Sequence, residues 1–594
     1  MSRLATTASR PLARRPVAGA LLAAFLLGVS CAGPEVARDA ASGRSSWGLG
    51  GTAPAAQGTQ GMVVSGHGLA SDVGAAVLEQ GGNAIDAAVA VGFALSAVLP
   101  AAGNIGGGGF LVYRSNDGEV RALDYREKAP GAATRDMFVD DEGKVAESAV
   151  IGHLAAGVPG SVAGLWEMHR TYGSLPWSDL VTPAIELAHG HEIDEPRARS
   201  LKSAAPRLSR FPASAMQFLV DGEAPSPGAI LEQRDLAATL QAIAEQGPDG
   251  FYRGRVADLI VAEMERGGGL ISHQDLEDYA PVWREPVEVA YRGHTIHSMP
   301  PVSSGGLTLG LILNILEGWD SLPPFGSPDL IHLEAEAMRL AFRDRNTLLG
   351  DPDFVDVPRG QFESQDYADG LRARIDPERA RPLPPIEVAP PAESTETTHY
   401  SVVDRWGNAA SVTTTINSGF GNAVTVTGAG FLLNNEMDDF AASPGQPNQF
   451  GLVEGENNAI VPGKRMLSSM TPSIVLSPEG ELMMVVGTPG GPTIITTVYH
   501  VISNVIDHGM GLRQAVESPR VHHQAWPDQV FYEEGGLGGA TLEDLAARGH
   551  ELVERGLSGD VSAILVEGSS LLGVADPRRG GGVSAPRGDA PAGG

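Results

Sequence analysis

Apolar residues recur at helical spacing from residue 70 to residue 98, and the sequence Gly-Gly-Asn at residues 81–83 interrupts them. Because glycine and asparagine break helices, this pattern predicts two helices, with Asn83 or Asp86 capping the second. Helical patterns dominate from Ser161 to about Glu317, and a further helix is predicted from Pro328 to about Thr347.

A period of two replaces the helical period near residue 397. His399 to Asp404 alternates like a strand, residues 405–408 form a turn, and Ala409 to Asn417 is the predicted returning strand. Residues 110–113, 473–476 and 482–487 are further short β-rich segments. The pattern therefore predicts a mixed α and β protein with a helix-rich first part and a β-rich second part.

The composition indicates an acidic protein with enough hydrophobic residues to form a core. The chain has 594 residues, of which 42% are hydrophobic, and its formal net charge is −30. A surface of that charge repels nucleic acid and anionic lipid headgroups, so we expect neither as a partner. The segment from Arg381 to Ser394 contains five prolines and no helical period, which indicates an exposed joint between the two parts.

The N-terminus is typical of an export signal. Basic residues, including Arg14 and Arg15, precede an apolar run from Val17 to Val29 that is too short to span a bilayer. We expect residues 1–31 to be a signal peptide and residues 32–60 a flexible leader. The single cysteine, Cys31, favours lipid attachment, with ordinary cleavage near Ala32 as the alternative. The mature protein is then exported, either periplasmic or anchored to the outer membrane through Cys31.

Thr397 is a candidate nucleophile because it follows the proline-rich joint. A threonine hydroxyl needs a base, and a threonine at a chain terminus has its own α-amine, whose reference pKa is about 7.7–8.0. This chemistry requires the backbone to be cut immediately before Thr397, between Glu396 and Thr397. The plain alternative is that Thr397-Thr398 merely starts a strand.

Other candidate sites have weaker patterns. The glycine run from Gly103 to Gly109 lacks the following Lys-Ser/Thr of a phosphate loop and precedes a strand. The histidine pairs at residues 189 and 191 and at 522 and 523 lack convincing partner ligands. We therefore expect no metal and no cofactor.

Several motifs occur in an order that is more specific than any one of them. They are NIGGGGF (104–110), YREKAP (125–130), GVPG (157–160), MPP with SSGG (299–306), TTHYSVVD with GN (397–408), LLNNEMDDF (432–440), LSSMTP (467–472), PGG (489–491) and DPR (576–578). From about Met62 to Arg578 the chain resembles the γ-glutamyltransferases. This resemblance implies a four-layer αββα sandwich of the N-terminal nucleophile hydrolase type, an α+β fold. It also implies a large subunit, residues 61–396, and an interlocked small subunit, residues 397–594.

The resemblance implies a role for each matching residue. Thr397 would cleave the chain and then form a γ-glutamyl-enzyme, Thr415 would steady its amine, and the N–H groups of Gly490 and Gly491 would stabilise the oxyanion. The substrate-binding residues would be Arg126, Asn417, Glu436, Asp439, Ser468 and Ser469. Arg126 and the two serines would hold the substrate α-carboxylate, and the acids with Asn417 its ammonium. Strand parity supports this in part, because Thr413, Thr415 and Asn417 would share one strand face.

The implied activity is hydrolysis and transfer of γ-glutamyl groups, with glutathione as donor and amino acids or peptides as acceptors. One departure is Phe450, which stands in the lid loop where many bacterial relatives have tyrosine and so lacks a hydroxyl hydrogen bond. Two alternatives are an acylase for glutaryl cephalosporins and a non-catalytic, uncleaved binding protein. The acid at Asp439 argues against the first, because a glutaryl group has no ammonium.

Overall fold

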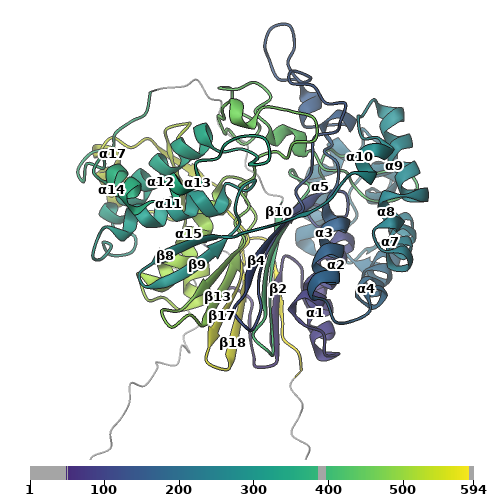
Figure 1. The fold of residues 1–594 in the computed structure, drawn as a ribbon, viewed down its shortest axis with the longest axis horizontal. Coiled ribbons are helices and arrows are strands. Elements are labelled where there is room, and N and C mark those ends of the chain that lie inside the picture. The colour runs from purple at the N-terminus through teal and green to yellow at the C-terminus, as the bar shows by residue number, and fades with distance from the viewer. Residues whose placement is uncertain (1–48, 50, 385–396, 588–594) are drawn as a thin grey trace, which may run out of the picture. The chain divides into compact units, whose positions relative to one another are not determined.

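The computed structural model describes residues 49, 51–384 and 397–587 (Figure 1). Two seven-stranded sheets face each other within it. The first contains β1 (Ala55–Gly58), β18 (Ser570–Ala575), β17 (Ser562–Glu567), β13 (Leu482–Gly487), β12 (Ser473–Leu476), β9 (His294–Ser298) and β8 (Val287–Tyr291), in that order. The second contains β19 (Gly582–Ser584), β2 (Gly61–Ser65), β10 (Thr397–Asp404), β11 (Ala409–Thr415), β3 (Gly108–Arg114), β4 (Val120–Asp124) and β7 (Val282–Arg284).

Helices cover the outer face of each sheet. α1 (Gly68–Glu79), α2 (Ala84–Val98), α3 (Ser161–Tyr172), α4 (Trp177–His189) and α7 (Arg234–Gln246) lie on the side of the second sheet. α11 (Gly305–Glu317), α12 (Pro328–Leu348), α15 (Thr493–Ile506) and α16 (Leu512–Glu517) lie on the side of the first. Figure 1 shows the sheets between these two groups of helices. The expected four-layer αββα sandwich is confirmed.

The remaining elements are shorter or peripheral. The helices among them are α5 (Glu195–Leu208), α6 (Pro212–Phe218), α8 (Asp249–Tyr252), α9 (Gly254–Gly267), α10 (His273–Glu277), α13 (Arg359–Phe362), α14 (Gln365–Arg372) and α17 (Gly539–Ala547). The strands are β5 (His191–Glu192) with β6 (Ile230–Leu231), and β14 (Val521–His522) with β15 (Val530–Glu533) and β16 (Leu552–Arg555). Within the described residues, no helix combines the length and the apolar composition needed to cross a membrane.

The alternation along β10 decides where its side chains lie. Tyr400 and Val402 are buried against the helices, whereas Val403 is buried between the sheets. Because side chains alternate along a strand, Thr397 shares the inner face with Val403. Ser401, on the same face, donates a hydrogen bond to the carbonyl oxygen of Ser562 in the opposite sheet at 2.9 Å. Thr397 therefore begins its strand at the end of the space between the two sheets.

Several local predictions agree with the structure. Asn83 caps α2 through a capping box with Asp86, and α12 spans the predicted helix after Pro328. The predicted hairpin is β10 with β11, in which Thr397 pairs with Thr415. Each sheet contains strands from before and after Thr397, so the two predicted subunits interlock.

Other predictions were wrong. Strand β1 lies inside the expected leader, residues 32–60, and pairs with β18. Strands β7 to β9 lie inside the stretch predicted as helical, and within it Val287–Tyr291 alternates between buried and exposed residues, a period of two that the longer helical pattern hides. The glycine-rich segment after Arg578, which lies beyond the family resemblance, contains β19, and this strand pairs with β2. The second part also contains helices, of which α15 has fourteen residues.

Candidate active site

The glycine run before β3 holds the strand end that carries Thr415. The Asn104 side chain donates to the carbonyl oxygen of Thr415 at 3.0 Å and accepts from the N–H of Gly107 at 2.9 Å. A Cβ at Gly107 would overlap the Thr415 carbonyl oxygen, and one at Gly109 would crowd the Thr413 carbonyl. Glycine is required here because two strands approach closely. This packing explains the glycine run at residues 103–109 without a phosphate-binding role.

Thr397 and Thr415 face each other across the first pair of β10 and β11. Their hydroxyl oxygens are 3.2 Å apart, and the Thr415 hydroxyl also accepts the N–H of Asn417 at 2.8 Å. Both side chains are buried. Asn417 lies beyond the end of β11 with φ 72°, so the predicted strand parity does not extend to it. Asn417 nevertheless lines one cavity together with Thr397 and Thr415. Its side chain donates a hydrogen bond to the Asn435 carbonyl at 3.0 Å.

Arg126 pairs with the two predicted acidic residues, Glu436 and Asp439, in the cavity that contains Thr397. Its guanidinium forms ion pairs with Glu436 and Asp439, and all three side chains line one cavity with Thr397. The two acids belong to a single 3₁₀ turn, Glu436–Asp439, and both reach the same guanidinium. Arg126 is 1% exposed, and its Nε also donates to the Met466 carbonyl at 3.3 Å.

Carboxyl groups outnumber the single guanidinium of Arg126 in its immediate surroundings. Glu127 lies 3.8 Å from Arg126, so three carboxyl groups surround one guanidinium. Burial raises the pKa of Glu436 and of Asp439, and it raises that of Glu127 to about 7. Among the described residues, Glu436 Oε2 has no hydrogen-bond partner although it is buried. A buried cationic group that donates hydrogen bonds would satisfy both this atom and the excess charge.

Ser468 and Ser469 form another wall of the cavity. The Ser468 hydroxyl accepts the N–H of Met470 at 3.1 Å, and its carbonyl accepts the Ser304 hydroxyl at 2.6 Å. Ser469 accepts a hydrogen bond from Arg345 at 3.3 Å. These contacts hold both serines beside Thr397 and Arg126.

Gly490 and Gly491 precede helix α15 at the mouth of the cavity. They have φ values of 139° and 57°, which L-residues with side chains rarely adopt. Their carbonyl groups accept from Thr493 and Ile494, whereas their N–H groups donate to no other described residue. Gly491, Pro492 and Ile494 line the cavity of Thr397, and Gly490 lines an adjoining one. The unused N–H groups and the positive end of the helix dipole can stabilise an oxyanion.

The cavity is therefore complementary to an amino-acid zwitterion placed next to the Thr397 hydroxyl. A sequence profile described as Gamma-glutamyltranspeptidase matches residues 70–586. The chain belongs to the γ-glutamyltranspeptidase family. This confirms the resemblance found in the sequence, and the protein is an enzyme of this family.

Individual relatives align over most of the chain. The glutathione hydrolase proenzyme of Escherichia coli K12 is 45% identical over 527 residues, which cover 87% of this chain and 90% of that protein. The acylase ACY 1 proenzyme of Pseudomonas sp. SE83 is 40% identical over 509 residues, 84% of this chain and 88% of that protein. A crystal structure of cephalosporin acylase from Bacillus halodurans has a TM-score of 0.81 at 28% identity and covers 92% of this chain and 100% of its own.

Phe450, the predicted lid residue, lies in the lining of the cavity that contains Thr397, the predicted nucleophile. Phe450 is 7% exposed and lines the cavity of Thr397, and its carbonyl accepts the Gln524 side chain at 3.2 Å. Its role as a gate stays a prediction. Cys31 and Glu396, the predicted lipidation and cleavage positions, lie outside the described residues.

Sequence reasoning missed Arg345. This buried residue lines the cavity, forms an ion pair with Glu454 and donates to Ser469 and to Ser304. Its signal in the sequence is the polar run of residues 343–346 inside a helix that is otherwise largely buried. We expect Arg345 to position Ser469 for the substrate carboxylate.

One cluster among the described residues has the composition of a metal site. Ligand atoms of His332, Glu336 and His550 lie within 4.8 Å of one another. The two histidines hydrogen-bond to each other at 2.7 Å, and Glu336 forms an ion pair with Arg339. Burial lowers the pKa of His550 to about 3, so its imidazole is neutral at pH 7. His522 and His523, considered above, instead contact Thr496 and Asp528.

Replacing Thr415 tests the hydroxyl pair. Thr415→Val keeps the side-chain shape but removes the group that contacts the Thr397 hydroxyl and accepts the Asn417 N–H. We expect kcat and the rate of self-cleavage each to fall about tenfold, since one hydrogen bond is lost and a buried donor is left unpaired. Thr415→Ser keeps the hydroxyl and should stay near the wild-type rates. Equal rates in Thr415→Val and wild type would show that this contact has no role in either reaction.

Proposed function

We propose that the protein cleaves itself before Thr397 and then transfers γ-glutamyl groups from glutathione and related compounds to water or to amines. One observation carries this proposal: the Thr397 hydroxyl shares a cavity with Arg126, Glu436 and Asp439. A γ-glutamyl group carries an α-carboxylate, which fits a guanidinium, and an α-ammonium, which fits paired carboxylates.

In the proposed self-cleavage the Thr397 hydroxyl attacks the carbonyl carbon of Glu396. The bond from that carbon to the Thr397 nitrogen breaks, and the nitrogen takes up a proton to become a free α-amine. Water then hydrolyses the ester that remains on the Thr397 hydroxyl. The cleavage therefore produces the base that later turnovers need, because the new amine belongs to the same residue as the nucleophile.

In turnover the Thr397 amine accepts the hydroxyl proton as the oxygen attacks the γ-carbonyl carbon of the donor. The N–H groups of Gly490 and Gly491 stabilise the oxyanion, and one such donor typically contributes about 3–4 kcal/mol. The amine then returns the proton to the leaving nitrogen. Water, or the amine of an amino acid or peptide, attacks the γ-glutamyl-enzyme and releases glutamate or the transpeptidation product.

Export forms part of the proposal and is supported by sequence alone. The basic N-terminus, the apolar run and Cys31 favour a protein that acts in the periplasm or on a lipid anchor in the outer membrane. Glutathione that reaches this compartment would be its donor.

The decisive assay compares two donors that differ in one group. We expect the purified protein to release glutamate from glutathione and to prefer γ-glutamyl over glutaryl amides by about 100-fold or more, because the glutaryl group leaves the buried acids without an ammonium. Preference for the glutaryl amide would instead identify an acylase, the activity named for the Pseudomonas relative. If the protein hydrolysed neither donor, the result would favour the alternative of a non-catalytic binding protein.

A further inference from the structure

A second, larger cavity adjoins the first at Thr397. It has a volume of about 730 Å³, and Thr397 and Phe450 line both it and the cavity of Arg126. When an acyl group occupies the first cavity, the group attached through the scissile bond must extend away from it. The second cavity is therefore the space for the leaving amine and, in the reverse direction, for the acceptor.

The charge of this cavity is opposite to that of the whole protein. Its described lining includes five arginines, Arg197, Arg199, Arg207, Arg578 and Arg579. The acidic side chains in the same lining are Glu192 and Asp560, whereas the chain as a whole has a net charge of −30. Clefts lined by one sign of charge concentrate ligands of the other sign.

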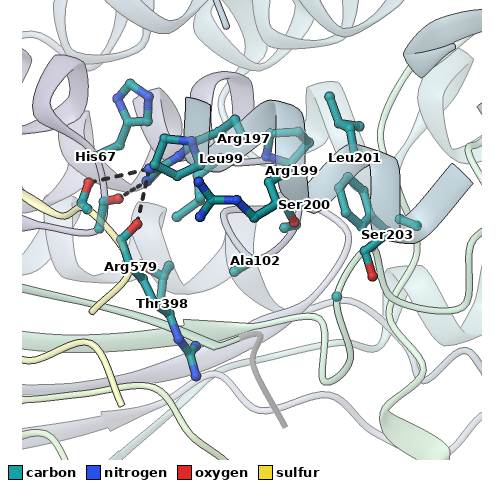
Figure 2. Close-up of a pocket in the computed structure, with 18 of the residues that line it drawn as sticks. His67, Leu99, Ala102, Arg197, Arg199, Ser200, Leu201, Ser203, Thr398 and Arg579 are labelled. Carbon is teal, nitrogen blue, oxygen red and sulfur yellow. Dashed lines mark hydrogen bonds between the residues drawn. The ribbon is translucent and has the colours of Figure 1, made fainter. Parts of the chain in front are cut away.

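Two of the arginines contact the protein itself. Arg197 donates to the carbonyl groups of Gly66, Arg579 and Gly580 (Figure 2). Arg578 forms ion pairs with Glu533 and Asp576. Burial, followed by the charge of Arg197, lowers the pKa of His67 to about 3, so this neighbour is neutral.

Two further arginines lie on one face of helix α5. Arg199, Ser203 and Arg207 are spaced four apart on α5, so they follow one face of this helix, and all three line the cavity. Arg199 is largely exposed beside Glu195, and Arg207 donates to the Gly419 carbonyl at 2.8 Å. Figure 2 shows Arg199 and Ser203 on the helix, with Arg579 on the C-terminal segment next to the same space.

We propose that Arg199 and Arg207 bind a carboxylate on the amine part of the substrate, so that the enzyme selects donors and acceptors whose leaving or attacking amine belongs to an anionic amino acid or peptide. This inference rests on the proposed function and adds a specificity site to it. The C-terminal carboxylate of the cysteinylglycine part of glutathione has the required chemistry. A guanidinium binds a carboxylate through charge-assisted hydrogen bonds, and Ser203 can add a neutral donor.

The test uses two chromogenic donors that differ only in one carboxylate, γ-glutamyl-4-nitroanilide and γ-glutamyl-3-carboxy-4-nitroanilide. The measured quantity is the ratio of kcat/KM for the carboxylated donor to that for the plain donor. We expect this ratio to fall about tenfold or more in Arg199→Ala/Arg207→Ala, since the variant loses charge-assisted hydrogen bonds to the carboxylate. Arg207→Lys, in the wild-type background, should retain most of the ratio because it keeps the charge.

Lys202→Ala is the matched control, because Lys202 is exposed on the same helix and lies outside the described lining of the cavity. Its ratio should equal that of the wild type. An unchanged ratio in the double arginine variant, or an equal loss on both donors, would overturn the inference. If the wild type hydrolysed neither donor, the proposed function itself would fail, which is a different result.

Discussion

Thr397→Ala should remain a single uncut chain and should hydrolyse no γ-glutamyl donor at a measurable rate. The substitution removes the hydroxyl that attacks in both reactions, and the loss of a nucleophile of this kind costs about a millionfold in kcat. Intact mass and the release of glutamate from glutathione measure the two effects separately.

Thr397→Ser is the matched control, because it keeps a hydroxyl in the same place and should still cleave itself. Thr397→Ala should also fold stably as an uncut chain with a cooperative thermal transition. In the described structure the Thr397 side chain makes one hydrogen bond, to Thr415, so its loss costs little stability. Cleavage at the wild-type position in Thr397→Ala would contradict the assignment of the nucleophile.

Asp439→Ala should raise KM for γ-glutamyl donors by about 100-fold and leave self-cleavage intact. The variant removes one of the carboxyl groups placed to hold the substrate ammonium, and truncation of one partner of a buried charge pair typically costs about 2–5 kcal/mol. Self-cleavage involves no substrate ammonium, so the intact mass should still show two fragments.

A glutaryl donor provides the internal control for Asp439→Ala. It has no ammonium, so the preference of the enzyme for γ-glutamyl over glutaryl amides should largely disappear in the variant. Asp439→Asn keeps the shape of the side chain and shows the part of the effect that is due to charge. Unchanged kinetics would refute the assigned ammonium contact, whereas loss of both substrates would indicate collapse of the Arg126 ion pairs.

The sequence predicts those features that depend on neighbours in the chain. The capping box at Asn83 and the hairpin after Thr397 have signals within a few residues, and both occur in the structure. The residues of the Thr397 cavity came from motifs in a family resemblance rather than from spacing. The structure places Arg126, Glu436 and Asp439 together, although Arg126 lies more than 300 residues from the two acids.

Features that depend on tertiary packing were not predicted. Strands β1 and β19 are short edge strands without strong alternation, and they form because β18 and β2 offer unpaired edges. Asn417 leaves the strand pattern because it turns with a positive φ. The basic cavity arises where α5 packs beside the C-terminal segment, so no local pattern in either segment reveals it.

The most direct test of the account is the intact mass of the purified wild-type protein together with the first residue of its smaller fragment. The account predicts two fragments, the smaller of which begins with Thr397 and carries a free amine. A single uncut chain that hydrolyses glutathione at full rate, with the Thr397 nitrogen still in a peptide bond, would contradict it.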